Sequence, residues 1–181
     1  MSSQEPIWIA RDYLKCSGCR KCEIACSLFH EKRIWPEASR IRIFMLVPGA
    51  EFPHFCTQCD DYPCVKSCPV AALSVNKNTG AVSVDKNKCT TCGLCIDACP
   101  GNVPHIHPTE KYALICDLCE GDPQCAKVCQ EGGWNALRII TKAFEKNMGR
   151  DRAYKLYARK PEEVTRDLVA LLYGEAGQEL I

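Results

Sequence analysis

The sequence predicts an α+β fold in which short β-hairpins and short helices alternate with cysteine-rich loops. Three features of the 181 residues lead to this prediction. Sixteen cysteines fall into four groups of related spacing, alternating apolar runs flank a turn between two of the groups, and a helical apolar pattern stands near the C-terminus. Apolar residues make up 46% of the chain, which is enough for a globular core.

The four cysteine groups share one spacing pattern. Each begins with two cysteines separated by two residues, and its fourth cysteine follows the third after three residues. A repeated ending of this kind indicates one structural unit that is used four times. The groups are Cys16, Cys19, Cys22 and Cys26; Cys56, Cys59, Cys64 and Cys68; Cys89, Cys92, Cys95 and Cys99; and Cys116, Cys119, Cys125 and Cys129.

This spacing is typical of cysteines that ligate [4Fe–4S] clusters. Three thiolates from one tight loop reach three irons of a cube, and the fourth cysteine is free to ligate a neighbouring cube. In two-cluster bacterial ferredoxins the run C-x2-C-x2-C-x3-C-P works in this way, and residues 89–100 match it at every position. The second group also ends in Cys-Pro, whereas the first and fourth groups lack the proline.

Zinc sites and disulfides explain the pattern less well. A structural zinc commonly takes two C-x2-C pairs from separated loops, so the remaining cysteines of each group would be surplus. Cysteines two residues apart seldom meet the geometry for pairing with each other, and disulfides suit small secreted chains. The first thirty residues hold charged side chains and a cysteine group in place of an apolar signal segment. We therefore expect a cytoplasmic protein with four [4Fe–4S] clusters.

Charge and motifs exclude several other functions. The chain has 23 basic and 22 acidic side chains, so no overall field favours nucleic acid, and no apolar run approaches the roughly 18 residues of a membrane span. Motifs of a serine nucleophile, a phosphate-binding loop or a dinucleotide site are missing from the sequence. We expect an electron carrier that is not an enzyme by itself.

The four histidines are expected to be structural. They are His30, His54, His105 and His107. His105 and His107 alternate as two metal ligands could, but nothing near them in the sequence completes a site.

Short strands are expected at residues 7–10, 40–47 and 112–115, and a hairpin is expected around Asn78, Thr79 and Gly80. Residues 1–140 thus read as two ferredoxin-like units, and 141–181 read as a helical C-terminal extension. Gly18 and Gly93 stand inside cysteine loops, where they either permit tight turns or let backbone amides approach the cluster sulfides.

The C-terminal extension begins with a basic stretch, for which a solvated face is the expected role. Its basic residues are Lys142, Lys146, Arg150, Arg152, Lys155, Arg159 and Lys160. A helix should follow, with Pro161 in its first turn and Gly174 as its stop. Its apolar stripe consists of Val164, Leu168, Leu171 and Leu172. Such a stripe packs either on its own domain or on a partner subunit.

With these motifs the sequence resembles the four-cluster electron-transfer subunits of molybdenum and tungsten oxidoreductases, the iron–sulfur subunit type of dimethyl sulfoxide reductase. The resemblance rests on all sixteen cysteines. It implies that the first group pairs with the fourth (an outer unit, 16–26 with 116–129) and the second with the third (an inner unit, 56–68 with 89–99). The implied ligand sets are Cys16, Cys19, Cys22 and Cys129; Cys116, Cys119, Cys125 and Cys26; Cys56, Cys59, Cys64 and Cys99; and Cys89, Cys92, Cys95 and Cys68.

Within that family, the segment CSGCRKCEIACSLFHEKRIWPEASRIRIFMLVPG looks most like the small subunits of tungsten enzymes of the aldehyde:ferredoxin oxidoreductase type. These include aldehyde oxidoreductases and the ATP-independent benzoyl-CoA reductase of anaerobic metabolism. The resemblance implies a large tungsten- or molybdenum-pterin catalytic subunit as partner, together with a redox donor or acceptor protein. A molybdenum enzyme of the dimethyl sulfoxide reductase type, a free polyferredoxin and a zinc scaffold are the alternatives.

Overall fold

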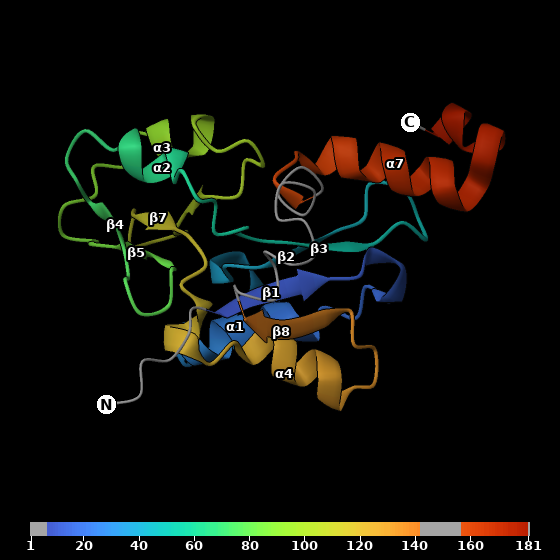
Figure 1. The fold of residues 1–181 in the computed structure, drawn as a ribbon, viewed down its shortest axis with the longest axis horizontal. Coiled ribbons are helices and arrows are strands. Elements are labelled where there is room, and N and C mark those ends of the chain that lie inside the picture. Colours follow the sequence, from blue (N-terminus) through green and yellow to red (C-terminus); the bar gives the residue numbers. More distant parts are fainter. Residues whose placement is uncertain (1–6, 142–156, 181) are drawn as a thin grey trace.

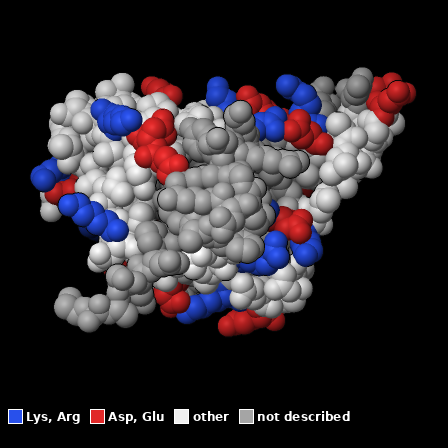
Figure 2. All heavy atoms as spheres, in the orientation of Figure 1, with Lys and Arg blue, Asp and Glu red and all other residues white. Residues whose placement is uncertain are grey.

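The computed structural model describes residues 7–141 and 157–180. Within these residues the chain forms small helices and antiparallel strand pairs around the cysteine loops (Figure 1). The expected mixture of short strands and short helices is confirmed. Among the same residues, no helix has the length and apolar character needed to cross a membrane. Basic and acidic side chains are both scattered over the described part of the visible face (Figure 2), as the balanced composition leads one to expect.

The strand pairs connect segments that flank the cysteine groups. They are β1 (Ile7–Arg11) with β8 (Leu137–Thr141), β2 (Arg42–Phe44) with β3 (Phe52–His54), β4 (Leu73–Val75) with β5 (Val82–Val84), and β6 (His105–Ile106) with β7 (Ala113–Leu114). Because β1 precedes the first group and β8 follows the fourth, their pairing brings the two ends of the cysteine-rich region together.

Two expected strands are shorter than their apolar runs. The strand expected at 40–47 ends at Phe44, because the chain turns at Pro48 and Gly49, where Val47 accepts a hydrogen bond from the amide of Ala50. The strand expected at 112–115 is reduced to β7. The predicted hairpin is present as β4 and β5, and Gly80 at its turn has a φ of 72°.

Proline determines how far each cysteine helix continues. The helices that carry the third cysteines are α1 (Lys21–Glu31), α2 (Pro63–Lys66), α3 (Leu94–Asp97) and α4 (Gln124–Glu131). The second and third groups end in Cys-Pro, and a residue before proline disfavours helical geometry, so α2 and α3 have only four residues each. Without that proline, α1 continues for 11 residues and α4 for 8.

Short 3-10 turns connect these elements: η1 (Tyr13–Lys15), η2 (Pro36–Ala38), η3 (Leu118–Gly121) and η4 (Gly174–Leu180). Helices α1 and α4 pack together beside β1 and β8, and α2 and α3 lie together beside β4, β5 and β7 (Figure 1). Cysteines take part in the apolar core at both places. Cys22, Cys26, Cys116 and Cys125 pack with Ile9, Ile41, Phe55 and Leu137 at the first, and Cys64 and Cys95 pack with Leu73, Val82 and Ile115 at the second.

The C-terminal helix α7 (Pro161–Tyr173) has the predicted bounds, with Pro161 in its first turn and Gly174 at its C-cap. It packs on its own chain, because Val164, Leu168 and Val169 are buried against residues that include Phe52. The outer part of the predicted stripe, Leu171 and Leu172, stays exposed.

Only the end of the basic stretch lies within the described residues, since 142–156 fall outside them. In this end part, Arg159 forms ion pairs with Glu163 and Asp167 of α7. These two contacts are partly exposed, so they fit the expected solvated role.

Truncation of Val169 tests the packing of α7. Val169→Ala removes two fully buried methyl groups and should lower the free energy of unfolding by about 2 kcal/mol. Leu172→Ala is the matched control, because Leu172 is 47% exposed and its loss should change stability by less than about 0.5 kcal/mol. Guanidinium unfolding of the anaerobic protein measures both. Equal effects of the two substitutions would contradict the packing of α7 on its own chain.

Candidate functional site

The cysteine loops turn sharply just before their helices. The residue that precedes α1, α2 and α3 is left-handed in each case, with φ of 59° at Arg20, 44° at Tyr62 and 83° at Gly93. The turn folds the first two cysteines of the loop back toward the third, which lies in the first turn of the helix. Gly18 is also left-handed, with a φ of 67°, so both loop glycines serve tight turns.

Three cavities in the structure are each lined by four cysteines. Each cavity has a volume of about 20 Å³, and the three are lined by Cys16, Cys19, Cys22 and Cys129; by Cys56, Cys59, Cys64 and Cys99; and by Cys68, Cys89, Cys92 and Cys95. Each combines three cysteines of one group with the last cysteine of another. Their similar volumes and identical donor types indicate that they accept the same kind of group.

The remaining cysteines also lie together. Negative charge on Cys26 acts on both Cys119 and Cys125, and Cys125 in turn acts on Cys116. Burial, with a smaller contribution from the charge of Cys26, raises the pKa of Cys119 to about 12. The structure therefore brings together all four sets of residues that the family resemblance implied.

Burial makes these thiols poor anions on their own. It raises the pKa of Cys22, Cys56, Cys116 and Cys125 well above the ordinary range, and neighbouring cysteines add to the rise. A buried thiolate needs a nearby positive charge, which iron supplies while displacing the proton. Sets of four sulfur donors around a cavity fit a [4Fe–4S] cluster.

Three of the last cysteines in the groups accept a backbone hydrogen bond. The amide of Arg40 donates to Cys26 Sγ at 3.3 Å, that of Ala72 to Cys68 Sγ at 3.3 Å, and that of Val103 to Cys99 Sγ at 3.5 Å. Hydrogen bonds to ligand sulfurs favour the more negative, reduced state of a cluster. Sequence reasoning missed these donors because none stands inside a cysteine motif.

Two histidines are held neutral by the protein interior. Burial, followed by a nearby arginine, lowers the pKa of His54 and of His105 to about 4. His54 donates from Nε2 to the carbonyl of Gly101 at 2.8 Å, which ties β3 to the segment after Cys99. The structural role expected for these histidines agrees with this environment.

The other two histidines meet acidic residues from distant parts of the chain. His30 Nε2 lies 3.0 Å from Asp117 Oδ1, which links α1 to the fourth cysteine group. Ligand atoms of His107, Glu31 and Glu110 lie within 4.8 Å of one another. His107 thus has acidic neighbours that its local sequence did not reveal. Its Nδ1 accepts the amides of two following residues, an arrangement that holds the ring as a structural element.

Comparisons with known proteins agree with this chemistry. Residues 49–138 match the 4Fe-4S dicluster domain. The polyferredoxin-like subunit of the aliphatic sulfonate oxidoreductase of Pyrococcus furiosus is 51% identical over 172 residues, which cover 95% of this chain and 96% of that protein. The chain belongs to the family of 4Fe-4S dicluster, polyferredoxin-like subunits of oxidoreductases.

Two further matches have lower sequence identity. The thiosulfate reductase electron transfer subunit PhsB of Salmonella typhi is 29% identical over 161 residues, covering 80% of this chain and 82% of that protein. Among solved structures, a chain of the active site complex BamBC of benzoyl coenzyme A reductase, as isolated, aligns over 90% of this chain and 96% of its own length with a TM-score of 0.43 and 22% identity.

Membership of this family establishes the general role. The chain is an iron–sulfur electron-transfer subunit of an oxidoreductase complex and carries more than one [4Fe–4S] cluster. The Pyrococcus furiosus and Salmonella typhi relatives are named as a polyferredoxin-like subunit and an electron transfer subunit, and not as the catalytic component. The expectation that it is not an enzyme by itself is confirmed.

Acidification should destabilise the protein through His54. Below pH 6.5 the unfolded state binds a proton at this histidine, whereas the folded state does so only near pH 4. The free energy of unfolding should therefore fall between pH 6.5 and 4, by about 3 kcal/mol for this group at most. Denaturant midpoints across this range should fall less steeply in His54→Gln than in the wild type. Identical pH slopes would contradict the assignment.

Removal of iron should unfold the short helices that follow the cysteine loops. Helices of four residues, such as α2 and α3, are not stable without tertiary contacts, and the buried thiols supply many of those contacts. Anaerobic chelation should lower the far-UV circular dichroism and make all sixteen thiols reactive. Mock-treated protein is the control, and unchanged dichroism with protected thiols after chelation would contradict the account.

Proposed function

We propose that this subunit passes single electrons along four [4Fe–4S] clusters between a tungsten-pterin catalytic subunit and a redox donor or acceptor protein. The proposed ligand sets are Cys16, Cys19, Cys22 and Cys129 (cluster 1); Cys116, Cys119, Cys125 and Cys26 (cluster 2); Cys56, Cys59, Cys64 and Cys99 (cluster 3); and Cys89, Cys92, Cys95 and Cys68 (cluster 4). Each cluster would supply one-electron redox chemistry, and the protein would tune it by burial, hydrogen bonds and charge.

One observation carries the proposal. Three cavities of similar size each combine three cysteines of one group with the last cysteine of another. That mixture follows the ligand exchange of two-cluster ferredoxins, in which each run gives its fourth cysteine to the neighbouring cluster. The electrostatic contacts of Cys26 with Cys119 and Cys125 support the same exchange for cluster 2.

A linear order of the clusters is supported by electrostatic interactions between cysteines of different sets. Cys22 acts on Cys125, which connects clusters 1 and 2. Cys56 acts on Cys116, which connects clusters 2 and 3, and Cys64 acts on Cys95, which connects clusters 3 and 4.

The ends of this order are the parts nearest to solvent. Cys19 of cluster 1 and Cys92 of cluster 4 are exposed, whereas Cys116, Cys119 and Cys125 of cluster 2 are buried. Electrons would enter and leave at the two exposed ends.

We also propose the division into an outer unit with clusters 1 and 2 (groups 16–26 and 116–129), an inner unit with clusters 3 and 4 (groups 56–68 and 89–99), and an extension at 141–181.

The identity of the catalytic partner is the finer part of the proposal. It is supported by the likeness of the first segment to small subunits of tungsten enzymes, and by a 51% identical relative whose name places it in an oxidoreductase. A molybdenum enzyme of the dimethyl sulfoxide reductase type is the second candidate, because the thiosulfate reductase subunit PhsB is 29% identical.

Metal analysis of the complex tests the proposal. Anaerobic purification through a tag on this chain should recover a large subunit that contains tungsten, and this chain should hold about sixteen irons. Molybdenum in place of tungsten would favour the second candidate. Fewer than about twelve irons per chain would contradict four clusters, and a monomer without a partner would contradict a dedicated subunit.

Substitution of Cys26 tests the ligand exchange. Cys26→Ala should remove or convert cluster 2, whose other ligands belong to the fourth group, and leave cluster 1 intact. Cys129→Ala is the matched control, because it should damage cluster 1 instead. Electron paramagnetic resonance of the reduced variants, compared with Cys19→Ala and Cys119→Ala as references for the two clusters, identifies the one affected. Damage to cluster 1 in Cys26→Ala would refute the exchange.

A further inference from the structure

A buried arginine lies beside the second cysteine group. Arg11 is the last residue of β1 and is only 4% exposed. Among the described residues no carboxylate pairs with its guanidinium, and its Nε and Nη1 atoms make no hydrogen bond. Burying an unpaired charge is strongly unfavourable unless the surroundings compensate it.

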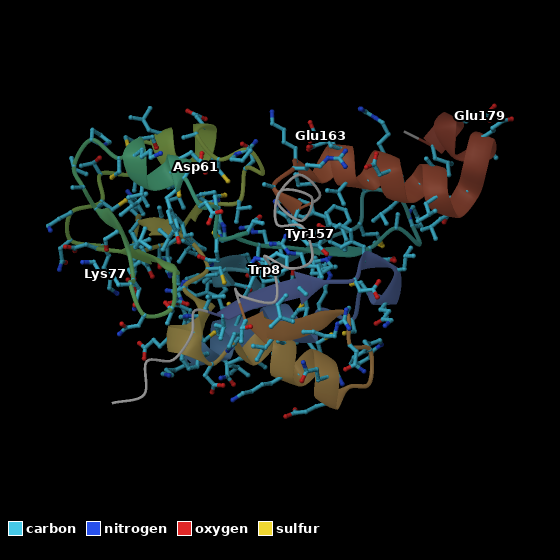
Figure 3. The ribbon with its side chains drawn as sticks, viewed as in Figure 1. Trp8, Asp61, Lys77, Tyr157, Glu163 and Glu179 are labelled. Atoms are coloured by element: carbon cyan, nitrogen blue, oxygen red, sulfur yellow. The ribbon has the colours of Figure 1, made fainter. Side chains whose placement is uncertain are left out.

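The surroundings hold the guanidinium firmly in place. Its central carbon lies 3.8 Å from the centre of the Phe55 ring and 5.0 Å from that of Tyr157. Nη2 donates to the carbonyl oxygens of Phe55 at 2.9 Å and Cys56 at 3.3 Å. Tyr157 also donates its hydroxyl to the carbonyl of Arg11 at 2.6 Å. Trp8 and Tyr157 lie next to each other over this part of β1 (Figure 3), with ring centres 5.5 Å apart.

Within residues 7–141 and 157–180, no neighbouring side chain supplies the missing negative charge. Burial keeps the nearby hydroxyl of Tyr13 neutral by raising its pKa, and burial together with Arg11 lowers the pKa of His54 to about 4. Asp12 is the next residue along the chain, but it forms an ion pair with Lys15 at 3.4 Å. In the described part of the chain, the buried positive charge therefore faces neutral groups and the backbone of the second cysteine group.

We propose that Arg11 is the positioned counter-charge of cluster 3 and raises its reduction potential above the value that the cysteine loop alone would give. This inference rests on the ligand set proposed above, in which Cys56 binds cluster 3. A cluster with four thiolates is negatively charged and gains a further negative charge on reduction, so a fixed cation stabilises the reduced form more than the oxidised form. Solvent, which would screen this effect, is excluded from the buried guanidinium.

The location gives this charge a role in electron transfer. Cys56 interacts with Cys116 of cluster 2, so Arg11 stands at the junction between the two pairs of clusters. Gln58 connects the loop of the second cysteine group to the fourth group, because its Nε2 donates to the carbonyl of Cys116 at 3.1 Å. A raised reduction potential of cluster 3 would favour reduction of this cluster, which lies in the middle of the proposed order.

Redox titration of the purified complex tests the inference. Arg11→Met keeps an elongated apolar side chain and removes the charge. It should lower the reduction potential of one cluster by at least about 59 mV, which is a tenfold decrease in the equilibrium constant for one-electron reduction. The affected cluster should be the one whose signal also changes in Cys59→Ser. Arg138→Met is the matched control, because Arg138 lies opposite Ala10 on the adjacent strand but is exposed to solvent. It should leave all potentials unchanged.

A second variant separates charge from shape. Arg11→Lys keeps the charge but loses the planar stacking, so its potential should remain close to that of the wild type. If Arg11→Met fails to retain its iron, Arg11→Lys decides the question. A lowered potential in Arg11→Lys, or unchanged potentials in an iron-replete Arg11→Met, would overturn the inference. Failure of the proposed function has a different signature, namely a wild-type chain with fewer than about twelve irons.

Discussion

Compensation of buried thiolate charge is the physical constraint on which this structure depends. Cysteines form a large part of the apolar core, and burial raises the pKa of most of them far enough that iron must supply the positive charge. The strands have two to five residues, and α2 and α3 have four each, so these elements could not sustain such a core alone. We therefore expect folding and cofactor binding to be coupled in this chain.

The same constraint explains how little regular structure joins the loops. Each loop needs only a left-handed turn, a first helical turn that carries its third cysteine, and an end of the helix that places the fourth cysteine near another group. Pro69 and Pro100 end α2 and α3 early, whereas α1 and α4 continue and pack on each other. The outer helices thus add protein packing to a unit that is otherwise organised by cysteine.

The cysteine loops, the hairpin around Gly80 and the bounds of α7 could be predicted from the sequence, because each depends on local spacing or on a proline or glycine signal. The contacts that depend on tertiary structure could not. Nothing in the sequence indicates that the amide of Arg40 lies beside Cys26 Sγ, or that Glu31 lies beside His107. The strand expected at 40–47 was also too long, because apolar periodicity does not show where a turn interrupts pairing. The pairing of cysteine groups came from family resemblance, since spacing alone allows other combinations.

The exchange of the fourth cysteines is the central claim, and iron-edge anomalous diffraction from anaerobic crystals tests it most directly. The account predicts four iron cubes per chain, with Cys26 Sγ bonded to the cube that Cys116, Cys119 and Cys125 hold. A bond from Cys26 to the cube of Cys16, Cys19 and Cys22 would contradict it.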